Sequence, residues 1–286
     1  MRRFLFSSLF LACTLVHADC GDASFARPLE GMQKVPTCET NGKDCVSSAY
    51  AVHKFSEAIP DDPTVMTVTA QGSPWRIYGP GNRILRIDEL AGILRDARSE
   101  GESKVVLMTS WSGVSPSPGV ASLADQVSRA LDGFPVEGQD GFLWISSKGE
   151  TRTTHQAFTA RDGNGSYGVA ADGEVFVPLA AGWVAQVVDQ AVGDVDPEYL
   201  VEAGVGWDAF MLCPSSALAM FERAGRSGSA VGSYNAAQML LARGQAGDRD
   251  AAIRWLRQAA VAGDKPAAEQ LASLAAEADA PAPKAN

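Results

Sequence analysis

The sequence predicts an α/β fold with a layered, largely parallel sheet and flanking helices, followed by a short module of helical repeats. Two observations support this prediction. Apolar runs such as 104–109 and 142–146 alternate with segments of helical periodicity such as 88–97, a pattern typical of parallel sheets connected by helices. The segment 217–228 recurs as 252–263, about 35 residues later, a spacing typical of helical hairpin arrays.

The 286-residue chain divides into five expected parts. They are a signal peptide at 1–18, an N-terminal arm with a helix at 19–63, an α/β domain with a β-hairpin extension at 64–200, helical repeats at 201–278 and a disordered tail at 279–286. Two basic residues, an apolar run over 4–16 and the small residue Ala18 at the cleavage position predict the signal peptide. That run is too short to span a membrane, and no other stretch approaches ~20 uninterrupted apolar residues. The sequence therefore predicts a periplasmic or secreted protein without a membrane span.

The chain is acidic, with a formal net charge of −10 at pH 7. Nucleic acids and anionic membranes attract basic proteins, so this charge argues against both as partners. A basic protein partner stays possible, although acidity also simply favours solubility. The sequence contains no phosphate-binding glycine loop, dinucleotide fingerprint or metal-ligand cluster, so we expect no cofactor and no metal.

Cleavage after Ala18 would leave four cysteines, an even number that suits an oxidising compartment. They are Cys20, Cys38, Cys45 and Cys213, which allow three pairings. Cys38 and Cys45 flank a turn-rich loop that could close locally. Cys20 and Cys213 would then tie the N-terminal arm to the start of the repeats. Zinc sites use paired short spacings that these cysteines lack.

The α/β part is expected to alternate strands with helices, which implies right-handed crossovers. We expect strands at 64–69, 75–78, 104–109 and 142–146, helices at 46–59, 88–97, 122–131 and 180–192, hairpins between 151 and 178, and a short helix from Pro197. Asp88 is expected to cap its helix. The loop 110–119 follows the carboxyl end of a strand, where α/β sheets bind ligands.

The repeated segments have the composition of closely packed helices. Small residues such as Ala236 and Ala259 let helix backbones approach, and larger residues such as Met239 and Trp255 fill the seam at helical spacing. We expect Trp255 to be substantially buried between two helices. Gly228 and Gly263 lie where left-handed C-terminal caps would end helices. Because short arrays cannot bury their faces alone, the module needs another part of the chain to stack on.

The helical module resembles the Sel1-like repeat, a relative of the tetratricopeptide repeat. The matching residues are Tyr234-Asn235, Met239, Gly244, Asp250-Ala251-Ala252, Trp255, Ala259-Ala260 and Gly263, about one and a half repeats. The resemblance implies a protein-binding module, whose concave face would be the contact surface.

The α/β part resembles the caspase-like hydrolase fold, including degraded relatives in bacterial toxins. In that family a Gly-His-Gly turn ends one strand and a cysteine ends the next. Here the turn is Gly79-Pro80-Gly81, so Pro80 stands in the place of the histidine, and Ser110 follows the strand in the place of the cysteine. The resemblance therefore implies a domain that has lost its catalytic pair.

The alternative is a hydrolase that uses Ser110, with His155 as base and Asp162 as acid. Ser110 lacks the Gly-x-Ser-x-Gly setting of a nucleophile elbow. His53, the other histidine beyond the signal peptide, lies among apolar residues of an expected helix, where a packing role is the simpler interpretation. Proline has no group that could accept a proton, so Pro80 offers no base.

The sequence favours a non-catalytic protein that binds another protein, with an inhibitor or immunity-type role as one specific form. The candidate contact residues are Ser110, Trp111, Tyr234, Arg254 and Trp255. The second hypothesis is the hydrolase with Ser110 as nucleophile. The third is a structural protein of the cell envelope without a specific partner.

Overall fold

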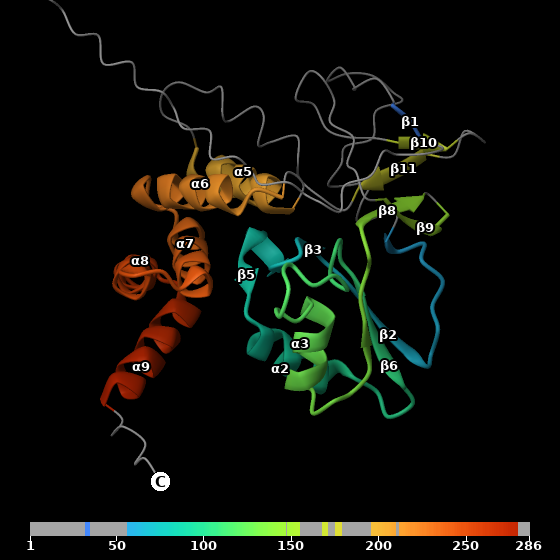
Figure 1. Cartoon of the computed structure of the whole chain (residues 1–286), viewed down its shortest axis with the longest axis horizontal. Helices are drawn as coiled ribbons and strands as arrows, with labels where there is room; N and C mark the ends of the chain where they lie inside the picture. Colours follow the sequence, from blue (N-terminus) through green and yellow to red (C-terminus); the bar gives the residue numbers. More distant parts are fainter. Residues whose placement is uncertain are drawn as a thin grey trace, which may run out of the picture.

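The computed structural model describes residues 32–34, 56–146, 148–154, 168–170, 175–178, 196–209 and 212–279. Over these residues the fold is mixed α/β, with a small parallel sheet in the N-terminal part and five helices in the C-terminal part. Figure 1 shows the helices α5–α9 on one side of the molecule and the sheets with α2 and α3 on the other. These two parts are called the helical half and the α/β half below.

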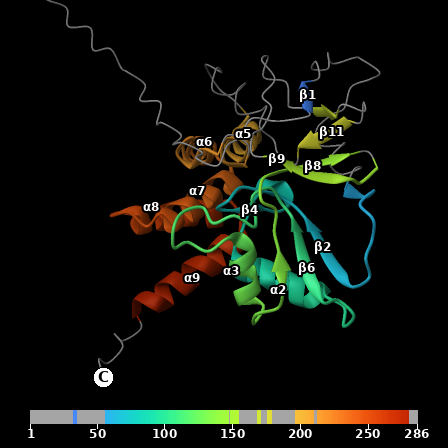
Figure 2. The same ribbon diagram turned by 45° about the vertical axis from the view of Figure 1, so that its right-hand side comes forward.

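The parallel sheet has the order β2-β6-β7, formed by β2 (Val65–Thr69), β6 (Lys104–Met108) and β7 (Val136–Glu137). Both strand pairs are parallel. The helices α2 (Ile87–Ala97) and α3 (Leu123–Ala130) pack against this sheet, as Figure 2 shows. Leu94 of α2 and Val127 of α3 share one buried cluster with Val105 and Leu107 of β6. The predicted strands and helices at these positions are confirmed.

The two helices begin differently. Ser122 caps α3 because its side chain accepts a hydrogen bond of 3.1 Å from the Asp125 amide, as N-cap residues do. Asp88 was expected to cap α2, but the N-cap residue is Arg86. Asp88 lies in the first turn, where a carboxylate suits the helix dipole, and pairs with the Arg86 guanidinium at 3.1 Å.

The other two sheets are antiparallel. The smaller contains β3 (Gln71–Gly72), β4 (Ile77–Tyr78) and β5 (Ile84–Leu85) in that order. The larger has the order β1-β10-β11-β8-β9 and contains β1 (Met32–Lys34), β8 (Phe142–Ser146), β9 (Thr151–Thr154), β10 (Gly168–Ala170) and β11 (Val175–Pro178). We expected β8 in the parallel sheet, but it pairs antiparallel with β11 and β9. An apolar run predicts a buried strand, and it leaves the direction of the neighbours open.

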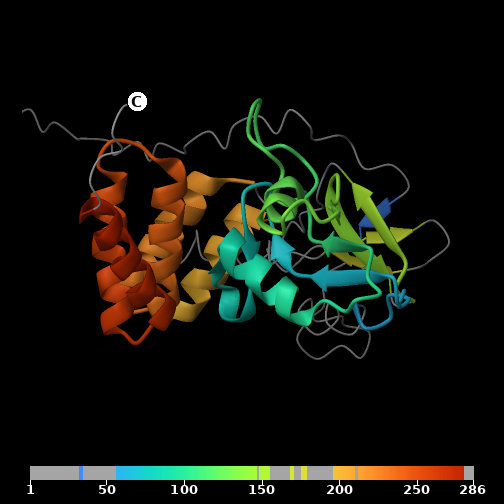
Figure 3. The ribbon, with the colours of Figure 1, turned by 90° about the horizontal axis from the view of Figure 1, so that it is seen from below.

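The helical half consists of α5 (Pro197–Ala209), α6 (Pro214–Arg226), α7 (Ala230–Arg243), α8 (Asp248–Val261) and α9 (Lys265–Asp279). Figure 3 shows them packed together at one end of the molecule, with α5 and α7 next to the β3-β4-β5 sheet. Gly228 and Gly263 follow α6 and α8 with φ values of 97° and 96°, so the predicted left-handed positions are confirmed. Ala236, Ala259 and Met239 are buried in the seam between the helices, as predicted.

Trp255 is half-buried, which is less than we expected. Its ring lies against Gly225 of α6. The approach is so close that a Cβ atom on Gly225 would be 2.8 Å from Trp255 Cζ3. We predict that Trp255→Ala lowers the free energy of unfolding by about 2 kcal/mol, below the ~3–5 kcal/mol typical of a fully buried aromatic residue. Urea denaturation checks this value. An unchanged midpoint would contradict the assignment of Trp255 to the helix seam.

Several predictions lie outside the described residues. They are the signal peptide, the helix at 180–192, most of the helix at 46–59, His53, His155, Asp162, and the cysteines Cys20, Cys38 and Cys45. Cys213 is fully buried just before α6. The pairings of the cysteines stay predictions. Within the described ranges, no helix is long and apolar enough to cross a membrane.

Candidate functional site

Ser110 and Trp111 directly follow β6 and lie in the interior. Ser110 is 1% exposed, and its Oγ accepts a hydrogen bond of 3.0 Å from the amide of Leu143. Trp111 is fully buried, with its ring edge-on to Phe142 at a centroid distance of 5.2 Å. Their burial corrects the expectation that both contact a partner, because a side chain without exposed surface offers no contact. Both residues instead hold the segment around β8 to the end of β6.

Ser110 is expected to act as a structural residue. Ser110→Ala removes the acceptor of a buried amide, so the free energy of unfolding should fall by about 1–3 kcal/mol. A fluorophosphonate probe should leave the folded wild-type protein unlabelled, because attack requires an exposed and activated hydroxyl. Labelling at Ser110 that heat denaturation abolishes would favour the hydrolase instead.

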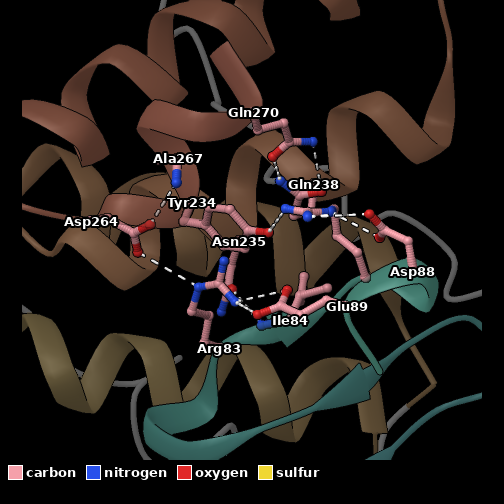
Figure 4. A network of polar contacts seen from close by, with 11 residues as sticks. Arg83, Ile84, Asp88, Glu89, Tyr234, Asn235, Gln238, Asp264, Ala267 and Gln270 are labelled. Atoms are coloured by element: carbon pink, nitrogen blue, oxygen red, sulfur yellow. Dashed lines mark hydrogen bonds and ion pairs between the residues drawn. The ribbon is translucent and has the colours of Figure 1, made fainter. Parts of the chain in front are cut away.

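Tyr234 and Asn235 of α7 point toward the α/β half, as Figure 4 shows. Asn235 Oδ1 accepts from the amide of Ile84, and Asn235 Nδ2 donates to the carbonyl of Asn82, both at 2.8 Å. The Arg83 guanidinium lies 3.8 Å from the centroid of the Tyr234 ring, a cation–π contact. Both repeat residues are fully buried. The expected partner contact at Tyr234 is therefore corrected, because the turn between β4 and β5 of the same chain covers this face.

The charges at this joint between the halves are paired. Arg83 contacts Glu89 of α2 at 3.0 Å and Asp264, just before α9, at 3.7 Å. Arg86 donates to the Tyr234 hydroxyl at 3.4 Å. Burial raises the pKa of Tyr234, although both neighbouring cations oppose this, so the phenol stays protonated at neutral pH. The expected need of the repeats for a stacking surface is met here by the α/β half.

A second buried network joins α5 to the hairpin formed by β3 and β4. Asp208, in the last turn of α5, is fully buried. Its Oδ2 accepts from the hydroxyls of Ser73 at 2.7 Å and Tyr78 at 2.9 Å, and its Oδ1 pairs with the Arg76 guanidinium. Burial, reinforced by the charge of Asp208, raises the pKa of Tyr78 well above its ordinary value. The phenol therefore stays protonated and donates a hydrogen bond to the Asp208 carboxylate.

This network fixes the tip of the β3–β4 hairpin at residues 73–76. The amide of Ser73 donates to the carbonyl of Arg76 at 2.9 Å, which closes a loop of two residues, Pro74 and Trp75. The Ser73 hydroxyl also accepts from the amide of Trp75 at 3.2 Å. As a result, Pro74, Trp75 and Arg76 form one wall of a cleft with a volume of about 610 Å³.

The opposite wall of this cleft comes from the helical half. It contains Ser215 and Leu218 of α6, and Met239 and Arg243 of α7. Arg243 is held by Asp248, which accepts from its Nε at 2.8 Å and from its Nη2 at 2.6 Å. These hydrogen bonds lower the pKa of Asp248 and keep it ionised.

The third side of the cleft is formed by Pro116 and Val120, in the loop before α3, and by Gln126 of α3. Val120 is among the exposed large apolar residues, with 46% of its surface open to solvent. The cleft thus combines apolar walls with two guanidinium groups, and its volume lies within the range of ligand pockets. We take it as the candidate binding site.

Two further predicted contact residues lie on α8, where Arg254 is exposed and Trp255 is half-buried. Neither lines the cleft. Arg76, Asp208 and Arg243 were not among the residues predicted from the sequence. Asp208 carried one usable signal, because it is an isolated acidic residue in the apolar stretch 203–210.

The fold and the site together define a mixed α/β protein whose helical half stacks on its own sheet region, with a cleft where the halves meet. The described residues contain no group of three histidine, cysteine or acidic side chains that could hold a metal ion. A family model described as a domain of unknown function (DUF8616) matches residues 42–153, which includes the parallel sheet, α2, α3 and β8. No curated protein and no solved structure matches the chain.

Proposed function

We propose that this is a non-catalytic protein of the periplasm or the extracellular space that binds another protein, and that a segment of the partner occupies the cleft between the halves. The observation that carries the proposal is the cleft itself. Leu218, Met239 and Val120 give it apolar surface, and Arg76 and Arg243 give it polar groups that can fix orientation. Trp75, at the hairpin tip, adds the kind of aromatic anchor that is enriched in protein interfaces.

A non-catalytic role is supported by the position of Ser110. Its hydroxyl is buried and already accepts a hydrogen bond from a main-chain amide. A nucleophile needs access to substrate and a base within hydrogen-bond reach. Ser110 lacks the first of these in the described conformation.

The finer assignments belong to the same proposal. We propose that the α/β half is a layered domain related to the caspase-like fold and that the helices are a Sel1-like module. An inhibitor or immunity-type role is the specific form of binding that we favour. In this proposal the signal peptide is cleaved after Ala18, and the disulfides Cys38–Cys45 and Cys20–Cys213 form after secretion.

Site-specific photo-crosslinking in the periplasm tests the function. A benzoylphenylalanine at Ser215, an exposed position of the cleft wall, should crosslink to a discrete partner. The same group at Val261, which is 91% exposed on α8 outside the cleft, should not. Val120→Glu should abolish the crosslink from Ser215, because it places a charge in the apolar part of the cleft.

Val120 is already half-exposed, so its replacement should leave the protein folded. Equal crosslinking from Ser215 and Val261 would contradict docking in the cleft. The proposal also fails if the Ser215 crosslink is unaffected by Val120→Glu.

A further inference from the structure

Arg76 is the more buried of the two cations that line the cleft. Its side chain is 10% exposed, compared with 44% for Arg243. Its guanidinium contacts Asp208 through Nη1, and its Nε has no acceptor among the described residues. Arginine carries five N–H donors in a planar fork, and the single contact with Asp208 engages only one arm of it. A buried donor without an acceptor is unfavourable. Arg76 lines the cleft, so a carboxylate bound there would bring further acceptors to this guanidinium.

Asp208 does not supply the missing acceptor, because it serves several donors. Its Oδ2 accepts from both Ser73 and Tyr78, and its Oδ1 takes the single contact from Arg76. The pair is therefore not the two-bond arrangement in which a carboxylate faces both arms of the guanidinium. Arg76 also lines a smaller adjoining cavity of about 140 Å³, so free space borders it on more than one side.

Arg243 places a second positive group on the opposite wall. Its Nε and Nη2 are engaged by Asp248, which holds the guanidinium in place at the end of α7. Between the two arginines the walls are mainly apolar, with Leu218, Met239 and Val120. A carboxylate that enters this cleft would therefore exchange water for charged donors in a partly desolvated site, where such hydrogen bonds are strong.

We infer that the cleft recognises an acidic side chain, an Asp or Glu next to an apolar residue in an extended segment of the partner, and that Arg76 binds its carboxylate. The inference rests on the proposed function and adds the chemistry of the bound segment. The net charge of −10 repels an acidic ligand at long range. Selection therefore comes from the local contact in the cleft and not from electrostatic steering.

Peptide binding to the full mature protein tests the inference. The probes are N-acetyl-leucyl-aspartyl-phenylalanine amide and its asparagine counterpart, which differ by one carboxylate. We expect the aspartyl peptide to bind with a Kd about tenfold or more lower. It should also shift the Arg76 Nε–H signal in ¹H–¹⁵N spectra, whereas the asparaginyl peptide should not.

Two variants assign the preference to Arg76. In Arg76→Gln combined with Asp208→Asn both charges of the buried pair are removed together, so no unpaired charge is left inside, and the preference for the aspartyl peptide should disappear. Arg257→Gln, which removes an exposed arginine of α8 outside the cleft, should leave it unchanged. If the double variant does not fold, the shift of the Arg76 Nε–H signal in the wild-type protein tests whether Arg76 binds the carboxylate.

Each outcome is decisive. Equal binding of both peptides would overturn the carboxylate recognition and leave docking in the cleft intact. A preference that survives in the double variant, or an Arg76 signal that stays in place, would overturn the role of Arg76. Absence of binding by both peptides contradicts the cleft as a docking site, and with it both the inference and the proposed function.

Discussion

Asp208→Asn is expected to lower the free energy of unfolding by about 3–5 kcal/mol. The substitution leaves the Arg76 guanidinium charged inside the protein, where its side chain is 10% exposed and forms an ion pair with Asp208. Removing one partner of a buried pair is costly because the remaining charge is neither hydrated nor neutralised. Urea denaturation followed by circular dichroism measures the change.

Two comparisons isolate the buried charge as the cause. Adding Arg76→Gln to Asp208→Asn should restore much of the loss, because the two residues are in contact and their effects are coupled. Glu137→Gln breaks the exposed ion pair in which Lys104 Nζ lies 2.8 Å from Glu137 Oε2. It should lower the free energy of unfolding by no more than about 1 kcal/mol. A loss in Asp208→Asn no larger than this control would contradict the role of the network in holding α5 to the hairpin.

The local elements could be predicted because their signals are local. Strand β6 is a continuous apolar run, and the helices α6 and α8 repeat with apolar residues at helical spacing and glycine after the last turn. Such patterns depend on a few neighbouring residues. Gly228 and Gly263 accordingly have the positive φ that their positions predicted.

Pairings between distant segments could not be predicted in the same way. The Arg76–Asp208 contact joins residues 132 positions apart, and nothing near either residue identifies the other. The partners of β8 posed the same problem, since Phe142–Ser146 is equally compatible with parallel and antiparallel neighbours. An isolated acid in an apolar helix does predict that some partner exists, but not which one.

Tyr234 and Asn235 show how a residue expected on a binding face can instead lie inside a contact within the chain. The resemblance to a repeat included both residues in its motif and made Tyr234 a candidate contact residue, and composition indicated that the short module had to stack on something. In the structure the expected contact face is the stacking face, because Asn235 binds the backbone of Asn82 and Ile84. The cleft that we propose as the binding surface lies at the edge of this contact and is lined by Trp75 and Met239.

The second large effect is expected for Phe221→Ala. Phe221 is fully buried on α6 and packs against α5, where a Cβ atom on Gly204 would lie 2.4 Å from Phe221 Cε1. Its ring also meets Tyr78 of the α/β half at a centroid distance of 6.4 Å. The substitution should lower the free energy of unfolding by about 3–5 kcal/mol, because it removes a buried ring and leaves a cavity between the helices.

Calorimetry or urea denaturation measures this loss, and Val261→Ala is the matched control. Val261 is 91% exposed at the end of α8, so its truncation should change stability by no more than about 0.5 kcal/mol. Phe221→Leu combined with Gly204→Ala should be more stable than the sum of the single effects predicts, because the new methyl group occupies space that the ring vacates. If Phe221→Ala unfolded at the same urea concentration as Val261→Ala, the packing of α5 on α6 would not be what holds the helical half together.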